Sequence, residues 1–398
     1  MNRKQFIFVL IALAIIGGAG LVLLRQNRQS WGIHEAKVGE KLLQHFPPND
    51  VAAVRIKGAS ELHIFQTNGL WRVREREDFP ANYPQLKDLL IKIRDTKVVQ
   101  SQQIGPSQLC RVDLDPDGPH QGTLLEFIDR QGKVFQSVRA GKMHLHNREE
   151  SVPFGLHGLF DGRYVLLPNE PENVLLISDD LASILPDPSV WLSKDFFKIE
   201  NVKFISLLSA NSAESWELAR ENESWPWTLV APRPSEALDT KMASELVEML
   251  RFLAFVDILP SPPPAPAETG FDKPIVMTIL TFDNFAYTLK IASPPERKPE
   301  GNYYLTVAVS AKLSTQRSSE SENAAEKEPR DAQFQDKLKR LRDKLGQESQ
   351  LAAAHRIFAV EPQIIDPLIR TRSQLLGKST IIGEQKAPSN GPLAEAGK

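Results

Sequence analysis

The sequence has little that would support disulfides, thiolate metal sites or nucleic-acid binding. Cys110 is the only cysteine among 398 residues, so an intramolecular disulfide is impossible and a zinc site built from several thiolates is excluded. Basic and acidic residues number 48 and 50, and the formal net charge is −2. A nucleic-acid-binding domain usually has a strongly basic surface. We therefore expect no nucleic-acid partner.

Catalytic motifs are also missing. The sequence has neither the G-x-S-x-G turn of serine hydrolases nor the H-E-x-x-H helix of zinc proteases. Residues 377–380 read Gly-Lys-Ser-Thr, like the end of a phosphate-binding loop, but Arg372 occupies the position of the first glycine that such a loop needs. We therefore predict no catalytic, cofactor-binding or metal-binding residues, and we interpret the chain as a protein that is not an enzyme.

One histidine pair leaves a second hypothesis open. His144 and His146 are two residues apart, which on a strand places both imidazoles on the same face. The nearby residues that could complete a metal site are His157, Glu149, Glu150 and Asp161. A zinc site needs three or four convergent ligands, so solvated polar residues on a hairpin are the simpler interpretation. The alternative is a metal-dependent or hydrolytic enzyme that uses this loop.

A long apolar run begins close to the N-terminus. Residues 6–24 carry no polar side chain, and basic residues stand on both sides of the run. About 20 apolar residues in a helix span the hydrocarbon core of a bilayer, so the run is long enough to cross a membrane. It continues past the small residues 17–19, which favours an uncleaved anchor over a signal peptide.

The location of the protein is predicted from this anchor. Nearly equal numbers of basic residues precede and follow the run, but its signal-like arrangement favours an N-terminus inside the cell. We predict that residues 1–30 form a single-pass anchor in the inner (cytoplasmic) membrane. The body of the chain is then expected on the periplasmic side, and the membrane is a partner through residues 6–24.

The remaining sequence is internally repeated. Trp71 and Trp227 each end a predicted hairpin that is followed by a proline and a helix, and later hairpins continue the correspondence. The first hairpin turns at Asn68-Gly69, which is a strong hairpin signal. We therefore predict an α+β fold made by tandem duplication of one unit of antiparallel strands packed on one main helix. The predicted domains are a first unit at 31–197, a second unit at 198–380 and a disordered tail at 381–398.

Each unit has one predicted main helix and a shorter closing helix. The apolar positions of the two main helices recur at helical spacing, and they are Leu86, Leu89, Leu90 and Ile93 in the first and Met242, Leu246, Leu250 and Leu253 in the second. Pro84 suits a first helical turn, and Asp239 is expected to cap the second helix. Closing helices are predicted at 181–185 and 364–376.

Two segments depart from the repeated plan. The proline-rich segment 260–266 is interpreted as a stiff spacer. The second segment, at about 316–350, is dense in charged residues and has no counterpart in the first unit. Its first half is expected to be disordered. Its second half has four apolar residues at helical spacing, which predicts a projecting charged helix that docks on the body or on a partner; they are Phe334, Leu338, Leu341 and Leu345.

These repeated features resemble a known family. Trp71-Arg72-Val73 and Trp227-Thr228-Leu229 each precede a proline and a leucine-rich helix, and the chain closes with Asp366-Pro367-Leu368 and Arg372-Ser373-Gln374-Leu375-Leu376. This pattern is similar to the domain of unknown function 4340 (DUF4340). The resemblance covers most of the chain after the anchor and brings no active site. It implies a bacterial, membrane-anchored, extracytoplasmic protein, often encoded beside ABC-type transport components of the gliding-motility auxiliary kind.

The leading hypothesis is therefore a non-enzymatic binding or scaffold component of an ABC-type transport or envelope complex. Transporter or envelope subunits are its expected protein partners. Besides the enzyme that uses the His144/His146 loop, a third hypothesis is ligand capture between the two repeats, because binding sites often form where two domains meet.

Overall fold

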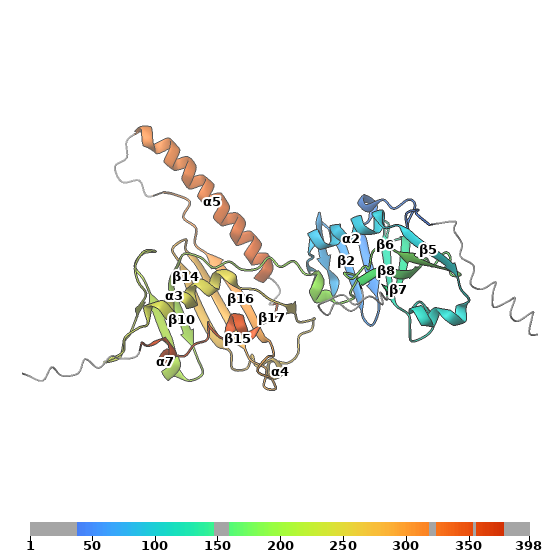
Figure 1. Ribbon diagram of the computed structural model, residues 1–398. Helices are drawn as coiled ribbons and strands as arrows, with labels where there is room; N and C mark the ends of the chain where they lie inside the picture. The colour runs from blue at the N-terminus through green and yellow to red at the C-terminus, as the bar shows by residue number, and fades with distance from the viewer. Residues whose placement is uncertain (1–37, 147–158, 318–323, 353–355, 378–398) are drawn as a thin grey trace, which may run out of the picture. The chain divides into compact units, whose positions relative to one another are not determined.

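The computed structural model describes residues 38–146, 159–317, 324–352 and 356–377, and shows a mixed α+β protein (Figure 1). The chain divides into two compact units, with the boundary after Asp195. Residues 6–24, which carry the predicted anchor, and the predicted tail at 381–398 lie outside the described residues. Among the residues that the structure describes, no helix is both long enough and apolar enough to span a bilayer.

The first unit contains one nine-stranded sheet in the order β4-β3-β2-β1-β6-β7-β8-β9-β5. All of its paired strands are antiparallel. Its main elements are β1 (Ala53–Lys57), β2 (Glu61–Thr67), β3 (Leu70–Val73), β4 (Phe79–Pro80), α2 (Tyr83–Asp95), β5 (Val98–Gln103), β6 (Thr123–Ile128), β7 (Val134–His146), β8 (Leu159–Leu166) and β9 (Asn173–Ile177). Short 3₁₀ helices include η2 (Pro48–Asp50) and η5 (Pro188–Trp191).

The hairpin and the main helix predicted for the first unit are both present in the structure. Asn68 and Gly69 both have positive φ and connect the paired strands β2 and β3, as a tight hairpin turn requires. The four apolar residues predicted along α2 are all buried. Asn82 caps the helix by accepting a hydrogen bond from the Gln85 backbone N–H, at 3.3 Å. These signals depend on neighbouring residues, which explains why they can be read from the sequence.

The closing helix predicted at 181–185 is wrong. The Asp179 carboxylate accepts a hydrogen bond from the Leu181 N–H at 2.8 Å, and the Asp180 carboxylate accepts one from the Ala182 N–H at 3.1 Å. These side chains offer the backbone a turn in place of a helix. The residues therefore form a turn, and the helical residues that follow are the 3₁₀ helix η5.

The second unit contains an eight-stranded sheet in the order β12-β11-β10-β14-β15-β16-β17-β13, again antiparallel throughout. Its strands are β10 (Val202–Leu208), β11 (Trp216–Ala219), β12 (Thr228–Leu229), β13 (Asp257–Ile258), β14 (Ile275–Thr281), β15 (Phe285–Ala292), β16 (Tyr303–Ala311) and β17 (Phe358–Val360). Its helices are α3 (Thr240–Met249), the 3₁₀ helix η7 (Leu250–Phe252), α4 (Pro266–Thr269), α5 (Ala324–Ala352), α6 (Pro362–Ile365) and α7 (Arg372–Leu375).

The main helix of the second unit is shorter than its apolar stripe predicts. Asp239 caps α3 as expected, because its carboxylate accepts hydrogen bonds from the N–H groups of Lys241 and Met242, each at 3.0 Å. Leu246 is buried within α3, but Leu250 belongs to the following 3₁₀ helix η7. Leu253 follows both and is still buried. The apolar stripe therefore identifies buried positions correctly, but the α-helix ends at Met249, before the last two residues of the stripe.

The charged segment forms a longer helix than the sequence predicts. Helix α5 begins at Ala324, inside the half that we expected to be disordered, and continues to Ala352. Its early residues are rich in alanine, glutamate and lysine, which favour helix. The helix contacts β16, and Leu338 is buried with only 4 % of its surface exposed. The helix therefore docks on the sheet of its own unit, and its N-terminal end extends beyond that sheet (Figure 1).

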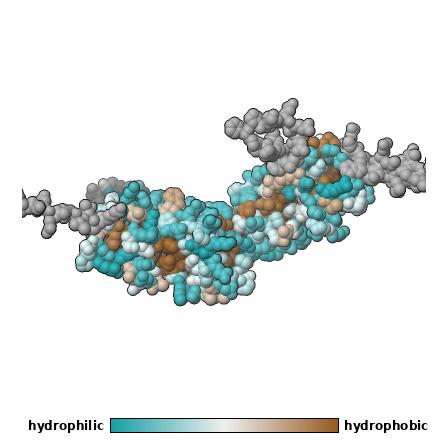
Figure 2. Space-filling view, turned by 60° about the horizontal axis from the view of Figure 1, so that its bottom comes forward, coloured by the Kyte–Doolittle hydropathy of each residue, from teal (hydrophilic) through white to brown (hydrophobic). Residues whose placement is uncertain are grey.

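On the face seen in Figure 2, the surface of the described residues is largely hydrophilic, with separate apolar areas. The large apolar side chains that are more than half exposed lie far apart in the sequence, and the most exposed are Leu208, Trp225 and Phe252. Scattered apolar residues of this kind are normal on soluble surfaces. They do not by themselves identify a binding site.

Candidate functional site

The histidine pair predicted as a possible metal site is only partly described. His144 lies in β7, opposite Gly162 of β8, and its ring meets Tyr164 edge to face with centroids 5.6 Å apart. His146 ends β7 and Asp161 lies in β8, but the side chains of both are outside the described residues. His157, Glu149 and Glu150 also lie outside them. Within the described ranges, no three histidine, cysteine or acidic side chains are grouped to hold a metal ion.

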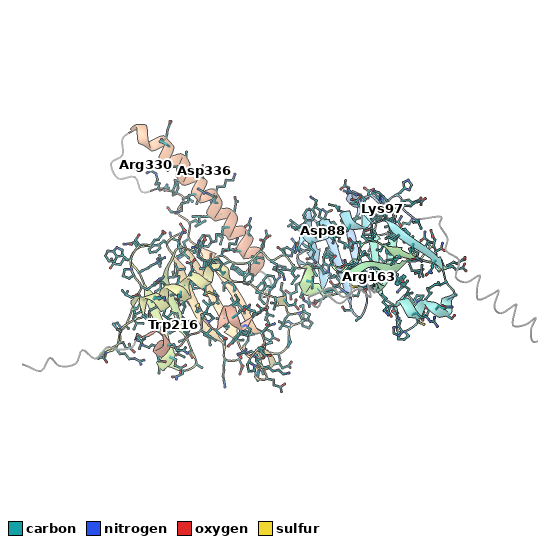
Figure 3. The ribbon with its side chains drawn as sticks, in the orientation of Figure 1. Asp88, Lys97, Arg163, Trp216, Arg330 and Asp336 are labelled. Carbon is teal, nitrogen blue, oxygen red and sulfur yellow. The ribbon has the colours of Figure 1, made fainter. Side chains whose placement is uncertain are left out.

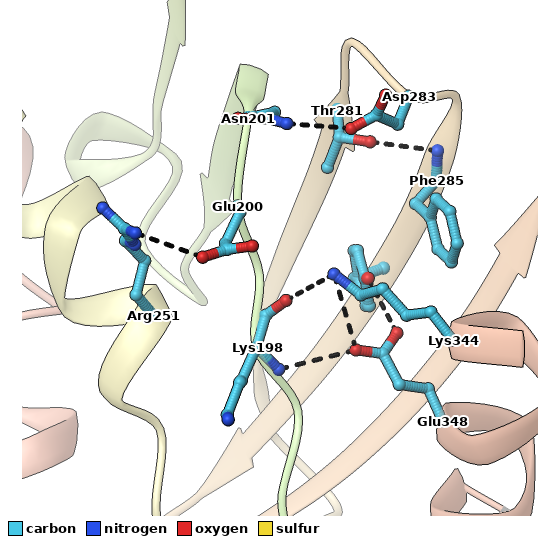
Figure 4. A network of polar contacts seen from close by, with 10 residues as sticks. Lys198, Glu200, Asn201, Arg251, Thr281, Asp283, Phe285, Lys344 and Glu348 are labelled. Carbon is cyan, nitrogen blue, oxygen red and sulfur yellow. Dashed lines mark hydrogen bonds and ion pairs between the residues drawn. The ribbon is translucent and has the colours of Figure 1, made fainter. Parts of the chain in front are cut away.

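A polar cluster joins α5 to the sheet of the second unit (Figure 4). At its centre is the Glu348 carboxylate, which is 4 % exposed although glutamate is normally a surface residue. The Tyr287 hydroxyl of β15 donates a hydrogen bond to Glu348 Oε2 at 2.8 Å. The backbone N–H of Lys198 is 3.5 Å from Glu348 Oε1. The helix thus presents a buried acid to donors from two distant parts of the chain.

Lys344 lies one helical turn before Glu348 and completes this cluster. Its ammonium is 3.8 Å from Glu348 Oε1 and donates a hydrogen bond to the Lys198 carbonyl at 2.7 Å. The same ammonium lies over the Phe285 ring, 5.4 Å from its centroid, which adds a cation–π attraction. A buried carboxylate is tolerated when it is paired and hydrogen-bonded, and these contacts meet that condition.

The surroundings shift the ionisation of both buried groups. Burial raises the pKa of the Glu348 carboxyl, and the Tyr287 hydrogen bond, Lys344 and the Lys198 N–H oppose this rise. Burial also raises the pKa of the Tyr287 hydroxyl, and the neighbouring Glu348 raises it further, so Tyr287 remains a hydrogen-bond donor. Perturbed pairs occur both at functional sites and in structural ion-pair networks. Here the pair lies buried between α5 and the sheet, where its contacts hold the helix in place, so we interpret the pair as structural.

A second polar contact holds α5 on the β14–β15 turn. The Lys337 ammonium is 2.7 Å from Asp283 Oδ1, and the Asn201 amide donates a hydrogen bond to Asp283 Oδ2 at 2.9 Å. Burial would raise the pKa of Asp283, but the hydrogen bonds from Lys337 and Asn201 outweigh it and lower that pKa. Asp283 is therefore a carboxylate at neutral pH. It binds α5 at Lys337, about three helical turns before Glu348.

These contacts leave one side of α5 uncovered. Leu338, Leu341 and Leu345 are buried or half-buried, whereas Lys339, Arg342 and other intervening residues are exposed. Figure 3 shows Arg330 and Asp336 on the half of α5 that extends beyond the sheet. The helix therefore has a docked side, which binds its own unit, and an exposed side of mixed charge. The exposed side is suited to contact with another molecule.

Sequence reasoning found the helix but missed the residues that hold it. Glu348 continues the helical spacing of Leu338, Leu341 and Leu345, and an acidic residue at the next position of an apolar stripe is a readable signal of a buried polar contact. Tyr287 and Lys198 gave no such signal. They are 61 and 150 residues from Glu348 in the sequence, and only the folded chain brings them together.

Comparison with known proteins identifies a family and no individual relative. No curated protein matches the chain, and no solved structure matches it. The family described as Domain of unknown function (DUF4340) matches residues 71–274, a segment that begins in β3 and ends directly before β14. The match thus includes parts of both units and just over half of the 398 residues. The chain therefore belongs to the DUF4340 family.

Proposed function

We propose that this protein is a non-enzymatic binding or scaffold component, anchored by residues 6–24 with its body outside the cytoplasmic membrane. In this proposal the protein acts together with subunits of an ABC-type transport or envelope complex. The apolar run and its basic flanks support the anchor. The resemblance that implies a bacterial extracytoplasmic protein supports the location and the class of partner.

The observation that carries the proposal is the two-sided character of α5. Its inner side is fastened to the sheet by the buried Leu338 and Glu348 and by the Lys337 contact with Asp283. Its outer side presents charged residues over many turns of helix, including the exposed Lys339 and Arg342. A helix that is already docked on its own sheet, with charged residues exposed on its outer side, can bind a complementary surface without losing much conformational freedom.

The repeated topology supports a scaffold role as well. We infer that the two units are tandem copies of one α+β unit. The order β3-β2-β1-β6-β7-β8-β9-β5 in the first sheet has the same connectivity as β12-β11-β10-β14-β15-β16-β17-β13 in the second. In both units the main helix comes after the first three of these strands and before the edge strand, β5 or β13, although in the first unit the short strand β4 stands between β3 and α2. A duplicated frame with one added helix gives two similar units, and within the described ranges the added helix is α5 of the second unit.

The location can be tested with the single cysteine. Cys110 is exposed, so a membrane-impermeant maleimide added to intact spheroplasts should label it if the body lies outside. The matched control is a Cys110→Ser chain that carries Asn2→Cys, in which labelling should require detergent because the N-terminus is inside. Labelling of Cys110 only after lysis would contradict the proposed location.

The partner can be tested by affinity purification of the full-length protein from its native membrane in mild detergent. Co-purifying proteins are identified by mass spectrometry. Recovery of transporter or envelope subunits in fixed proportion to the chain supports the scaffold proposal. Recovery of the chain alone, at high yield and without those subunits, would contradict it.

A further inference from the structure

A cavity of about 360 Å³ lies beside α2 in the first unit. This volume is at the lower end of the range for small-molecule sites. Its lining comes from η2 and the residue after it, from β2 and β3, from one side of α2, and from the β6–β7 turn. The residues that line it are Pro48, Asn49, Val51, Gln66, Trp71, Tyr83, Lys87, Leu90, Ile91, Arg94 and Arg130.

The charge of this cavity has one sign. Lys87, Arg94 and Arg130 line it, and no carboxylate is among the described residues of its wall. Arg94 is compensated, because its guanidinium is paired with the neighbouring Asp95, with Nε 2.9 Å from Asp95 Oδ1. Lys87 and Arg130 make no ion pair or hydrogen bond with any other described side chain. Two cations of the wall are therefore free to bind an anion.

The neutral part of the wall suits a ring with hydroxyl groups. Tyr83 is 52 % exposed, which is unusual for so large an aromatic side chain, and Trp71 provides a second ring. Asn49 and Gln66 contribute side-chain amides that both donate and accept hydrogen bonds. An exposed aromatic ring beside amides and cations offers an apolar surface, hydroxyl partners and charge within one small cavity.

We propose that this cavity, the α2 cavity, is a binding site for a small anionic ligand in which a carboxylate or phosphate group is attached to a saccharide-like ring. Lys87 and Arg130 bind the acidic group through charge-assisted hydrogen bonds. Tyr83 packs against the face of the ring, and Asn49 and Gln66 bind its hydroxyl groups. The site belongs to the first unit, and it requires neither α5 nor the membrane partner proposed above.

The second unit lacks this combination at the corresponding place. Counted from the helix caps Asn82 and Asp239, the positions of Tyr83 and Lys87 are taken by Thr240 and Ser244. The position of Arg94 is taken by Arg251, which pairs with Glu200 and Glu248 at 3.2 Å each. The corresponding turn, between β14 and β15, holds Asp283, which is bound by Lys337. Among the described residues, unpaired cations at this place beside the main helix are therefore found in the first unit and not in the second.

Binding is measured by isothermal titration calorimetry on the full-length protein in a non-ionic detergent. Three probes separate the chemistry: sodium glucuronate carries a carboxylate, glucose 6-phosphate carries a phosphate, and methyl glucoside carries no charge. The proposal expects saturable binding of at least one acidic probe, weaker binding at higher salt, and no measurable binding of the neutral sugar. Binding of glucuronate alone assigns a carboxylate ligand, and binding of glucose 6-phosphate alone assigns a phosphate.

Variants connect the binding to the cavity. The double change Lys87→Ala and Arg130→Ala should weaken binding of the acidic probe at least about tenfold, because each charged hydrogen bond contributes more than a neutral one. The matched control is Lys241→Ala with Lys290→Ala, which removes two exposed lysines of the second unit and should leave binding unchanged. The four changed residues are all exposed, and circular dichroism verifies folding.

Three outcomes would overturn the proposal. One is that neither acidic probe binds. Another is that methyl glucoside binds as well as the acidic probes, which would remove the role of charge. The third is that the control pair loses as much affinity as the Lys87 and Arg130 pair, which would indicate a general effect of net charge. None of these outcomes bears on the purification of membrane partners, so the two proposals are tested separately.

Discussion

The two units have separate sheets with the same connectivity, but the surfaces around those sheets differ. In both, antiparallel strands follow the same order, and one main helix packs on the sheet through apolar residues. In the first unit the surface beside α2 has free cations and a cavity. In the second unit Glu200 and Asp283 are each paired with a cation, and the 29-residue helix α5 supplies the Lys337 partner of Asp283.

This difference shows that the residues that form the fold are not the residues that could form a binding site. Buried apolar residues supply most of the stabilisation and recur in both units, whereas exposed charges contribute little to stability and can change at small cost. One frame can therefore carry the α2 cavity in the first unit and the docked helix α5 in the second, for which we propose ligand binding and partner binding respectively. Substitutions in each unit can test whether the two units are independent in this way.

Truncation of a core tryptophan should unfold one unit and leave the other intact. Trp216 is 1 % exposed and its Nε1 donates a hydrogen bond to the Arg370 carbonyl at 2.8 Å. Trp216→Ala should destabilise the second unit by about 3–5 kcal/mol. Hydrogen exchange followed by mass spectrometry should then show faster exchange throughout the second unit and unchanged exchange in α2.

The matched variant is Trp191→Ala in the first unit. Trp191 is fully buried and donates a hydrogen bond from Nε1 to the Leu185 carbonyl at 2.9 Å. It should produce the reverse pattern. If either substitution accelerated exchange equally in both units, the two would be one cooperative body and the comparison would fail.

Truncation of the leucine under α5 should release the helix while the sheet remains folded. Leu338→Ala should reduce docking by about 2–5 kcal/mol, since Leu338 is buried and its loss leaves a cavity. An undocked charged helix is only marginally stable, so exchange in α5 should rise to that of an open segment. Gln335→Ala, on the exposed side, is the control and should change nothing. Unchanged exchange in Leu338→Ala would mean that polar contacts alone hold α5.

Removal of the buried acid should weaken the same junction by a smaller amount. Glu348→Ala leaves the Tyr287 hydroxyl without its partner inside the junction, which costs about 1–3 kcal/mol. Exchange in the C-terminal half of α5 should increase, and exchange in the first unit should not. Equal exchange in the variant and the native chain would show that the contact contributes nothing to docking.

The pKa of Glu348 adds a pH dependence to this prediction. Because the docked state raises the pKa of this carboxyl, the docked state holds the proton more tightly than the undocked state. The contribution of Glu348 to docking, unlike that of Asp283, should be largest in acid, below the ordinary pKa of a glutamate, and should weaken as pH rises through the raised value. After correction for intrinsic exchange rates, Glu348→Gln should remove this dependence. A dependence of the opposite sign would contradict the assignment.

The smallest effect is expected at the hairpin of the first unit. Gly69 has a φ of +78°, and an added Cβ would meet no atom within 4 Å, so only the backbone conformation opposes a side chain. Gly69→Ala should therefore destabilise the first unit by about 1 kcal/mol. Thermal unfolding of the first unit should shift down slightly while α5 exchange is unchanged. A much larger loss of stability would contradict this explanation, because it would mean that the added methyl group meets other atoms of the protein.

Local features of the fold could be predicted from the sequence because their causes are local. The turn at Asn68-Gly69, the apolar side of α2 and the Asp239 cap each depend on residues within one or two turns. The helix expected at 181–185 failed for an equally local reason, because aspartate side chains replaced helical hydrogen bonds with a turn. The sequence shows that aspartates are present, but only the structure shows that their side chains bind the backbone N–H groups of a turn.

Neither the α5 junction nor the α2 cavity could be predicted in the same way. Tyr287 and Glu348 meet across 61 residues, and the cavity wall brings Asn49, Gln66 and Arg130 to one side of α2. A single sequence has no periodicity that relates such positions. The histidine pair at His144 and His146 shows the converse, since close spacing suggested a metal site, but apart from His144 the side chains of its proposed members lie outside the described residues.

The partner-binding role of α5 can be tested by comparing partner recovery by two variants of the full-length protein, purified from native membranes in mild detergent. Lys339→Glu with Arg342→Glu reverses charge on the exposed side of α5, and Lys241→Glu with Lys290→Glu makes the same change in charge elsewhere on the second unit. We expect the α5 variant to lose the transporter or envelope subunits while the control retains them. Equal recovery by both variants would contradict a partner-binding role for α5.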